Sequence, residues 1–146
     1  MADTRVRLGE IELKNPVMTA SGTFGSGTEY SEFVDLNKLG AVVTKGVANV
    51  PWPGNPTPRV TETASGMLNA IGLQNPGAHK VLEEELPKLR QVYHKKAIAN
   101  ISGFSVEDYA YTCQLLDKEE QVGILEVNVS CPNVHGGGMS FGTDPA

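Results

Sequence analysis

Residues 97–133 read AIANISGFSVEDYAYTCQLLDKEEQVGILEVNVSCPN, and this stretch decides the fold class. Its first five residues are mostly apolar and predict a short buried strand. Ser105, with Asp108 three positions later, is typical of a helix N-cap. An apolar stripe at helical spacing follows: Val106, Tyr109, Cys113 and Leu116. Residues 123–129 predict the next strand. A strand–helix–strand unit of this length predicts two parallel strands joined by a right-handed crossover.

The same alternation continues toward the N-terminus. Residues 17–20 and 41–44 predict two more buried strands, and a helix is expected over 30–36, ended by Gly40. A longer helix is indicated by apolar residues at spacings of four, three and four, namely Leu82, Leu86, Leu89 and Tyr93. We expect Pro87 to kink or restart it. Strand–helix order repeated about four times predicts a parallel sheet, either doubly wound or closed as a barrel.

The connecting segments are rich in glycine and proline. Gly9-Glu10 predicts a tight hairpin turn between residues 5–8 and 11–13. Residues 51–58 hold four prolines and predict an irregular excursion, with 59–63 returning as a short strand. Residues 66–77 are expected to form a second long loop.

Composition narrows the classes of protein. The 146 residues suffice for one ordinary core, and the net charge is −5 with a pI of about 5.1. No concentrated basic patch is present, which argues against a nucleic-acid face. No apolar run approaches the roughly 20 residues of a membrane span, and the N-terminus lacks a signal-peptide core. We therefore expect a cytoplasmic protein. The three histidines are His79, His94 and His135. Their spacing is not that of metal ligands, so we expect no metal site.

The unusual residues follow strands. Ser21-Gly22, Lys45, Asn100, Asn128 and Cys131 all lie at or just after a predicted strand end. In (β/α)₈ barrels the chemistry lies on that face. A complete barrel takes roughly 250 residues, so this chain corresponds to about half of one. We expect it to be cut rather than finished.

Two side chains at these ends are candidates for chemistry. Cys131 lies among serine, proline and asparagine, where a thiolate can act as a base. The alternative is a buried structural cysteine, which is how Cys113 is interpreted on its helical stripe. Lys45 ends an apolar strand and is either a fixed cation for an anionic ligand or a strand-end lysine that reaches solvent.

Amides and glycines complete the candidate set. Asn69, Asn100, Asn128 and Asn133 can pair with a ring that alternates carbonyl and N–H groups, although each is also a common turn residue. Residues 69–73 can present backbone N–H groups to a carboxylate. Trp52, between prolines, is a lid or an interface anchor.

Taken together, these stretches resemble the dihydroorotate dehydrogenase family. The motifs are long and specific: NPVMTASGTFG (15–25), TKG (44–46), GNPTPR (54–59), GMLNAIGLQNPG (66–77) and NVSCPN (128–133). The fourth is similar to the NAD-linked, two-subunit branch. The last is similar to the catalytic-base loop of the cytosolic class, whereas the membrane-bound class carries serine where Cys131 stands.

The resemblance implies an α/β fold with parallel strands. Residues 1–146 would form a single incomplete domain, the N-terminal half of an FMN-binding (β/α)₈ TIM barrel. The family oxidises (S)-dihydroorotate to orotate in pyrimidine biosynthesis, with Cys131 removing the C5 proton while the C6 hydride passes to FMN. Matched flavin contacts are Ala20, Ser21, Gly22, Lys45, Gly46, Asn100 and Asn128. Matched substrate contacts are Lys45, Asn69, Ala70, Ile71, Gly72, Leu73, Asn128 and Asn133.

The same branch implies a partner. It pairs this chain with an electron-transfer subunit that carries FAD and a [2Fe-2S] cluster and reduces NAD⁺, as a heterotetramer of two subunits of each kind. We expect the 146 residues alone to bind FMN poorly, to turn over slowly and to leave an open sheet edge prone to pairing. The alternatives are a flavin barrel like that of dihydropyrimidine dehydrogenase, a non-catalytic half-barrel binding module, and an aldolase-type barrel with Lys45 as its Schiff-base lysine.

Overall fold

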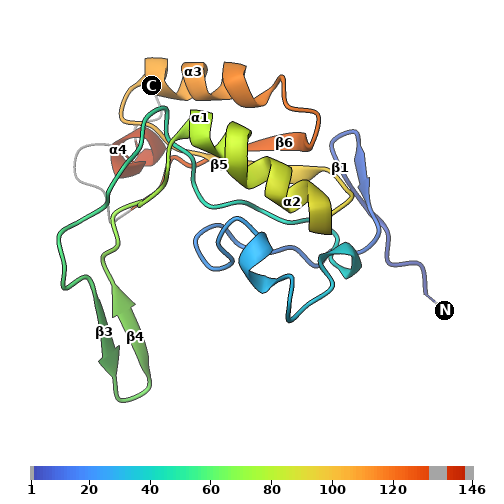
Figure 1. The fold of residues 1–146 in the computed structure, drawn as a ribbon, viewed down its shortest axis with the longest axis horizontal. Coiled ribbons are helices and arrows are strands. Elements are labelled where there is room, and N and C mark those ends of the chain that lie inside the picture. The colour runs from blue at the N-terminus through green and yellow to red at the C-terminus, as the bar shows by residue number, and fades with distance from the viewer. Residues whose placement is uncertain (1, 132–137, 144–146) are drawn as a thin grey trace.

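The computed structural model describes residues 2–131 and 138–143. Figure 1 shows helices and strands alternating from residue 78 onward, with a hairpin that extends away from the body. In chain order the elements are β1 (Val6–Leu8), β2 (Ile11–Leu13), the 3-10 turns η1 (Thr28–Tyr30) and η2 (Leu36–Lys38), β3 (Val60–Thr63), β4 (Gly66–Asn69), α1 (Ala78–Lys80), the π-helical turn η3 (Val81–Glu85), α2 (Leu86–Val92), β5 (Ala97–Ile101), α3 (Val106–Leu116), β6 (Val122–Val127) and α4 (Gly138–Thr143).

Four extended segments run parallel in chain order. β5 pairs with β6 in parallel, and the segment 41–47 pairs with β5 through parallel bridges at Val43–Ile98 and Val47–Ile101. On its other side this segment meets Met18, again in parallel, at Ala41. Parallel neighbours that follow chain order are the arrangement that the strand–helix alternation predicts.

The two faces of β5 pack against different layers. Ala97, Ala99 and Ile101 join the large core formed with the helices, whereas Ile98 joins a second cluster with Leu13, Ala41 and Val43. Successive side chains of a strand point to opposite faces. Asn100 therefore shares the face of Ile98, away from the helices.

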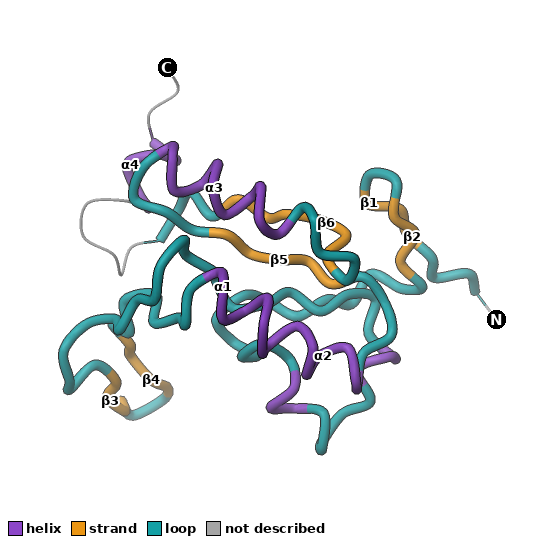
Figure 2. Tube along the Cα trace, turned by 45° about the horizontal axis from the view of Figure 1, so that its top comes forward, coloured by secondary structure: helices purple, strands orange, loops and turns teal. Residues whose placement is uncertain are grey.

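The helices cover one face of this sheet (Figures 1 and 2). The predicted stripe of the longer helix is buried at Leu86, Leu89 and Tyr93. The prediction for Pro87 is confirmed, because α2 begins at Leu86 with the proline in its first turn, after a π-helical turn. In α3 the stripe is buried only at its end, since Leu116 is buried and Val106 is exposed.

Three local predictions are wrong. Residues 17–20 are not a buried strand, because Val17 is 58% and Met18 45% exposed; within the described chain only the segment 41–47 pairs with them. The helix expected over 30–36 is replaced by the turns η1 and η2. Residues 66–77 do not form a loop throughout, since the first four are β4, which pairs antiparallel with β3.

The β3–β4 hairpin contrasts with the body. All eight of its strand residues are exposed. The predicted β1–β2 hairpin is present, with Gly9 at a φ of 61° in its turn. Among residues 2–131 and 138–143, no helix has the length and apolar composition to cross a membrane.

Candidate active site

Lys45 lies half-buried near the C-terminal end of the parallel segment 41–47. Its backbone N–H donates to the carbonyl of Gly25 at 3.0 Å, which joins the strand end to the loop after Ala20. Gly22 has a φ of 83°, and a Cβ placed there would lie 3.6 Å from the Lys45 ammonium nitrogen. The Ser21-Gly22 turn therefore lies beside the charged end of Lys45.

That turn is built from Ala20 and Thr23. The Ala20 carbonyl accepts from the Thr23 N–H at 3.2 Å and from the Thr23 hydroxyl at 2.7 Å. Glycine tolerates the positive φ that the turn requires at Gly22. The sequence stretch of small residues thus forms a compact turn at the predicted end of the sheet.

Gly46 lies at the centre of a polar cluster. A Cβ at this position would approach the Asn100 Oδ1 and a Leu73 methyl at 2.9 Å each, and the Ser102 hydroxyl at 3.2 Å. Asn100 and Ser102 are buried, and neither the Asn100 Oδ1 nor the Ser102 Oγ has a hydrogen-bond partner. Buried polar atoms are nearly always paired, so two orphaned oxygens at one strand end indicate a place for a ligand.

The rest of Asn100 is fixed. Its Nδ2 donates to the Glu126 carboxylate on β6, and its backbone N–H donates to the Thr44 hydroxyl at 3.3 Å. The amide is thus held between two neighbouring strands with its oxygen beside Gly46. The sequence predicts Asn100 as a site residue but not Ser102 or Thr44, because small hydroxyl residues are common at any strand end.

Cys131 lies close enough to Lys45 for their charges to interact. Burial lowers the pKa of the Lys45 ammonium, and the negative charge of the Cys131 thiolate acts in the opposite direction. The thiol is half-buried and forms no disulfide. Cys131 is therefore one of the groups that set the pKa of the Lys45 ammonium.

Asn128 follows β6 directly. Its backbone N–H donates to the Ile101 carbonyl at 2.9 Å, and its side-chain Oδ1 accepts from the Ser130 N–H at 3.2 Å. Its carbonyl accepts from the Tyr109 hydroxyl at 2.7 Å. Asn133 lies outside the described residues.

The expected substrate segment 69–73 is only partly at the site. Leu73 and Gly72 are buried, and Leu73 lies against Gly46, whereas Asn69 and Ala70 are exposed at the end of β4. The backbone N–H of Ala70 donates to the Arg59 carbonyl at 2.8 Å, so a substrate contact from Ala70 would use another of its atoms. Ile71 accepts a hydrogen bond through its carbonyl from the Asn55 N–H at 2.9 Å.

Asn75 was not predicted as a site residue, yet it sets the position of this segment. Its buried Oδ1 accepts from the N–H groups of Ala48 and Gly77 at 3.1 and 3.0 Å, and its Nδ2 donates to the Leu73 carbonyl at 2.8 Å. One amide thereby ties Leu73 to the strand that carries Gly46. An Asn-Pro-Gly sequence was the available signal, but it indicates a turn and not which backbone groups the amide reaches.

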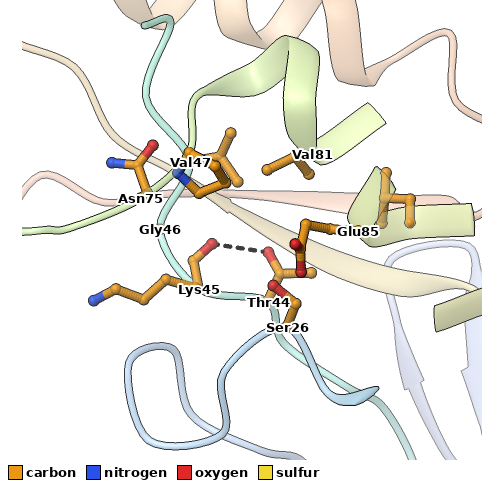
Figure 3. A pocket seen from close by; sticks show the side chains of 10 residues that line it. Ser26, Thr44, Lys45, Gly46, Val47, Asn75, Val81 and Glu85 are labelled. Carbon is orange, nitrogen blue, oxygen red and sulfur yellow. Dashed lines mark hydrogen bonds between the residues drawn. The ribbon is translucent and has the colours of Figure 1, made fainter. Parts of the chain in front are cut away.

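In the described part of the chain, a small cavity and an open groove adjoin Lys45, and neither is the candidate site. One is a cavity of about 10 Å³, room for about one water, between Thr44–Val47 and Val81 (Figure 3). In Figure 3 the Lys45 side chain extends away from Val81 and Glu85. The other is an open groove of about 550 Å³ lined partly by Trp52, whose ring packs on Phe104 at 4.6 Å. Neither contains Asn100 or Cys131, so we place the site on the contacts around Gly46 and Lys45.

A model of the family described as dihydroorotate dehydrogenase matches residues 4–146. The chain belongs to the dihydroorotate dehydrogenase family. It is 59% identical over 143 residues to the dihydroorotate dehydrogenase B (NAD(+)) catalytic subunit of Alkaliphilus metalliredigens, covering 97% of this chain and 46% of that protein. The protein of the same name from Lachnoclostridium phytofermentans is 57% identical, with 98% and 47% covered. The chain spans about half the length of the curated relatives it matches.

The fold of the family is confirmed by a solved structure. The dihydroorotate dehydrogenase of Eimeria tenella in complex with ferulenol matches with a TM-score of 0.71 at 22% identity, covering 92% of this chain and 38% of that one. The prediction of half a parallel (β/α)₈ barrel is therefore confirmed. The names of the relatives likewise confirm the predicted resemblance to the NAD-linked branch of the dihydroorotate dehydrogenases.

Proposed function

We propose that residues 1–146 form a single incomplete barrel domain, and that the protein to which it belongs oxidises (S)-dihydroorotate to orotate in pyrimidine biosynthesis, with FMN as cofactor and Cys131 as the base. The observation that carries the proposal is the pair of orphaned oxygens of Asn100 and Ser102 around Gly46, directly after Lys45. The charge of Cys131 acts on the pKa of Lys45, which supports the role of the thiol. Lys45 favours this reaction over oxidation of an uncharged dihydropyrimidine, because dihydroorotate is an anion and the ammonium is its natural counter-charge.

The residues fit FMN. Gly46 leaves open the space beside the Asn100 Oδ1 and the Ser102 Oγ, which are acceptors for ring N–H groups. Gly22 allows close backbone approach beside Lys45. The proposed flavin contacts are Ala20, Ser21, Gly22, Lys45, Gly46, Asn100 and Asn128. When bound, FMN supplies the two-electron acceptor for the hydride that leaves C6 of the substrate.

The chain supplies the proton chemistry and the binding. The Cys131 thiolate takes the C5 proton, and the Lys45 ammonium stabilises negative charge nearby. Half-burial of Lys45 strengthens this interaction, since a charge acts more strongly where water is excluded. The proposed substrate contacts are Lys45, Asn69, Ala70, Ile71, Gly72, Leu73, Asn128 and Asn133.

We infer that electrons leave FMN for another chain, because the relatives are named catalytic subunits. The two cysteines of residues 1–146 do not supply the four thiolates of a [2Fe-2S] cluster. Within the described part of the chain no group of His, Cys, Asp and Glu could hold a metal ion. We propose an electron-transfer subunit with FAD and the cluster, in a cytoplasmic heterotetramer of two subunits of each kind.

The decisive experiment is Cys131→Ser in the full-length, FMN-loaded protein. We expect the rate of flavin reduction by dihydroorotate to fall by about 10²–10⁴ at neutral pH, with the remaining activity at higher pH, because serine holds its proton more tightly than cysteine. Anaerobic stopped-flow absorbance of the flavin across pH measures this.

The matched control is Cys113→Ser on α3. Burial raises the pKa of the Cys113 thiol, and its side chain packs against the core, so we expect flavin reduction at the original rate. Unchanged kinetics in Cys131→Ser would remove this thiol from the mechanism.

A further inference from the structure

The phenol of Tyr109 links the ends of two neighbouring strands. From α3, its hydroxyl donates to the carbonyl of Asn128, just after β6, at 2.7 Å. Its ring lies against Gly103, just after β5. Gly103 lets the ring come close, since a Cβ there would lie 3.2 Å from the Tyr109 Cδ2. One side chain therefore contacts both strand ends, through a hydrogen bond at Asn128 and ring packing at Gly103.

The ring of Tyr109 also contacts α4. Its centroid lies 5.5 Å from that of Phe141, at an interplanar angle of 85°, an edge-to-face contact. α4 in turn packs on the backbone before Cys131, because a Cβ on Gly142 would lie 2.5 Å from the Val129 carbonyl. Tyr109 thus contacts the chain on both sides of Cys131 in the sequence.

The first turn of α3 is anchored to Asn49, which lies two residues after the segment 41–47 that carries Lys45. The Asn49 Nδ2 donates to the Asp108 carboxylate at 2.7 Å, and that carboxylate also accepts from the Phe104 N–H at 3.1 Å. The Ser105 hydroxyl caps the same turn through the Asp108 N–H at 3.1 Å. Tyr109 follows Asp108 directly. A continuous set of contacts therefore runs from the Lys45 segment through α3 to the residues that precede Cys131.

We propose that Tyr109 is a positioning residue that holds Asn128–Cys131 so that the thiol faces Lys45. The proposal rests on the proposed function, in which Cys131 is the base. Tyr109 does not exchange a proton in the reaction. It acts through the Asn128 carbonyl and the Phe141 ring. Because a misplacement of about 1 Å can cost about 10²-fold in rate, a side chain that fixes the backbone here affects the chemical step.

Three variants of the full-length, FMN-loaded protein test this. Tyr109→Phe removes the hydrogen bond and keeps the ring, and Tyr109→Leu removes both. Tyr111→Phe is the matched control, since it deletes a hydroxyl from the same helix; Tyr111 is 44% exposed and bonds to His79 at 2.9 Å. Melting temperature and FMN content establish that each variant is folded and loaded.

Two readouts are needed, one of chemistry and one of local order. We expect Tyr109→Phe to slow flavin reduction about 10-fold and Tyr109→Leu about 100-fold, with the dihydroorotate Kd within about threefold of the original. Backbone amides of peptides covering residues 126–131 should exchange hydrogen for deuterium about fivefold faster in Tyr109→Phe, the equivalent of about 1 kcal/mol. Tyr111→Phe should change neither.

The outcomes separate this proposal from the proposed function. Original reduction rates in Tyr109→Phe and Tyr109→Leu would overturn the role of Tyr109, as would slowed reduction without faster exchange at 126–131. Neither result touches Cys131. Unchanged kinetics in Cys131→Ser would instead remove the proposed function, whatever the Tyr109 variants do.

Discussion

The β5–α3–β6 unit and the excursion between Asn49 and Gly77 are held in place by different forces. All five residues of β5 are buried, paired on both sides and packed between two apolar clusters. All strand residues of the β3–β4 hairpin are exposed. The excursion is held at its base by hydrogen bonds. For example, the Arg59 guanidinium donates to the carbonyls of Pro53 and Asn55 at 3.0 and 3.1 Å. Burial positions one side of the site and hydrogen bonds position the other.

The largest expected difference between the two regions is in core packing. Ile101→Ala should lower the free energy of unfolding of the full-length protein by about 2–5 kcal/mol, because Ile101 is completely buried and a cavity would remain. Leu68→Ala in β4 should change it by less than about 0.5 kcal/mol, since Leu68 is 64% exposed. Chemical denaturation measures both. Equal losses would show that the hairpin is buried in the full-length protein, and the contrast would not hold.

A smaller difference is expected between two glycines, one in each region. Gly46→Ala should cost about 1–3 kcal/mol, because the new methyl would press on Asn100, Leu73 and Ser102. It should also weaken FMN binding at least about 10-fold, since the methyl fills the space beside the orphaned oxygens. Gly66→Ala in β4 is the control: the nearest atom to its Cβ would be 3.8 Å away, and stability and FMN affinity should not change. Flavin fluorescence titration measures affinity. Tight FMN binding by Gly46→Ala would place the flavin elsewhere.

The regions also differ in how far sequence predicts them. The strand 97–101, the Ser105 cap and the α2 stripe were predicted because each depends on periodicity or on residues a few positions apart. Residues 17–20 and 66–69 were assigned wrongly, because exposure and strand pairing depend on segments distant in the chain. The apolar run at 17–20 has the composition of a buried strand, but only one neighbour pairs with it in the described chain.

The site follows the same rule. Lys45 and Asn100 were predicted because strand ends of a parallel sheet meet at one edge. Tyr109 was interpreted only as part of an apolar stripe, and its contact with Asn128 spans 19 residues. Asn75 reaches Ala48 across 27 residues. Their partners could not be read from spacing, since a hydrogen bond across the fold leaves no local pattern.

The smallest expected effect tests a feature that was predicted from neighbouring residues alone, the Ser105 N-cap of α3. Ser105→Ala should lower the free energy of unfolding by about 1 kcal/mol, because the Asp108 N–H at the start of α3 would lose its acceptor. Ser65→Ala, in the exposed hairpin turn, should change it by less than about 0.5 kcal/mol. Because Asp108 is also bound to Asn49, loss of the cap should loosen α3 where it meets the Lys45 segment. Deuterium exchange in peptides covering 104–109 should therefore rise in Ser105→Ala and not in Ser65→Ala. No rise in either would mean that Asn49 and Asp108 alone hold the start of α3, and that the cap contributes nothing to the geometry of the site.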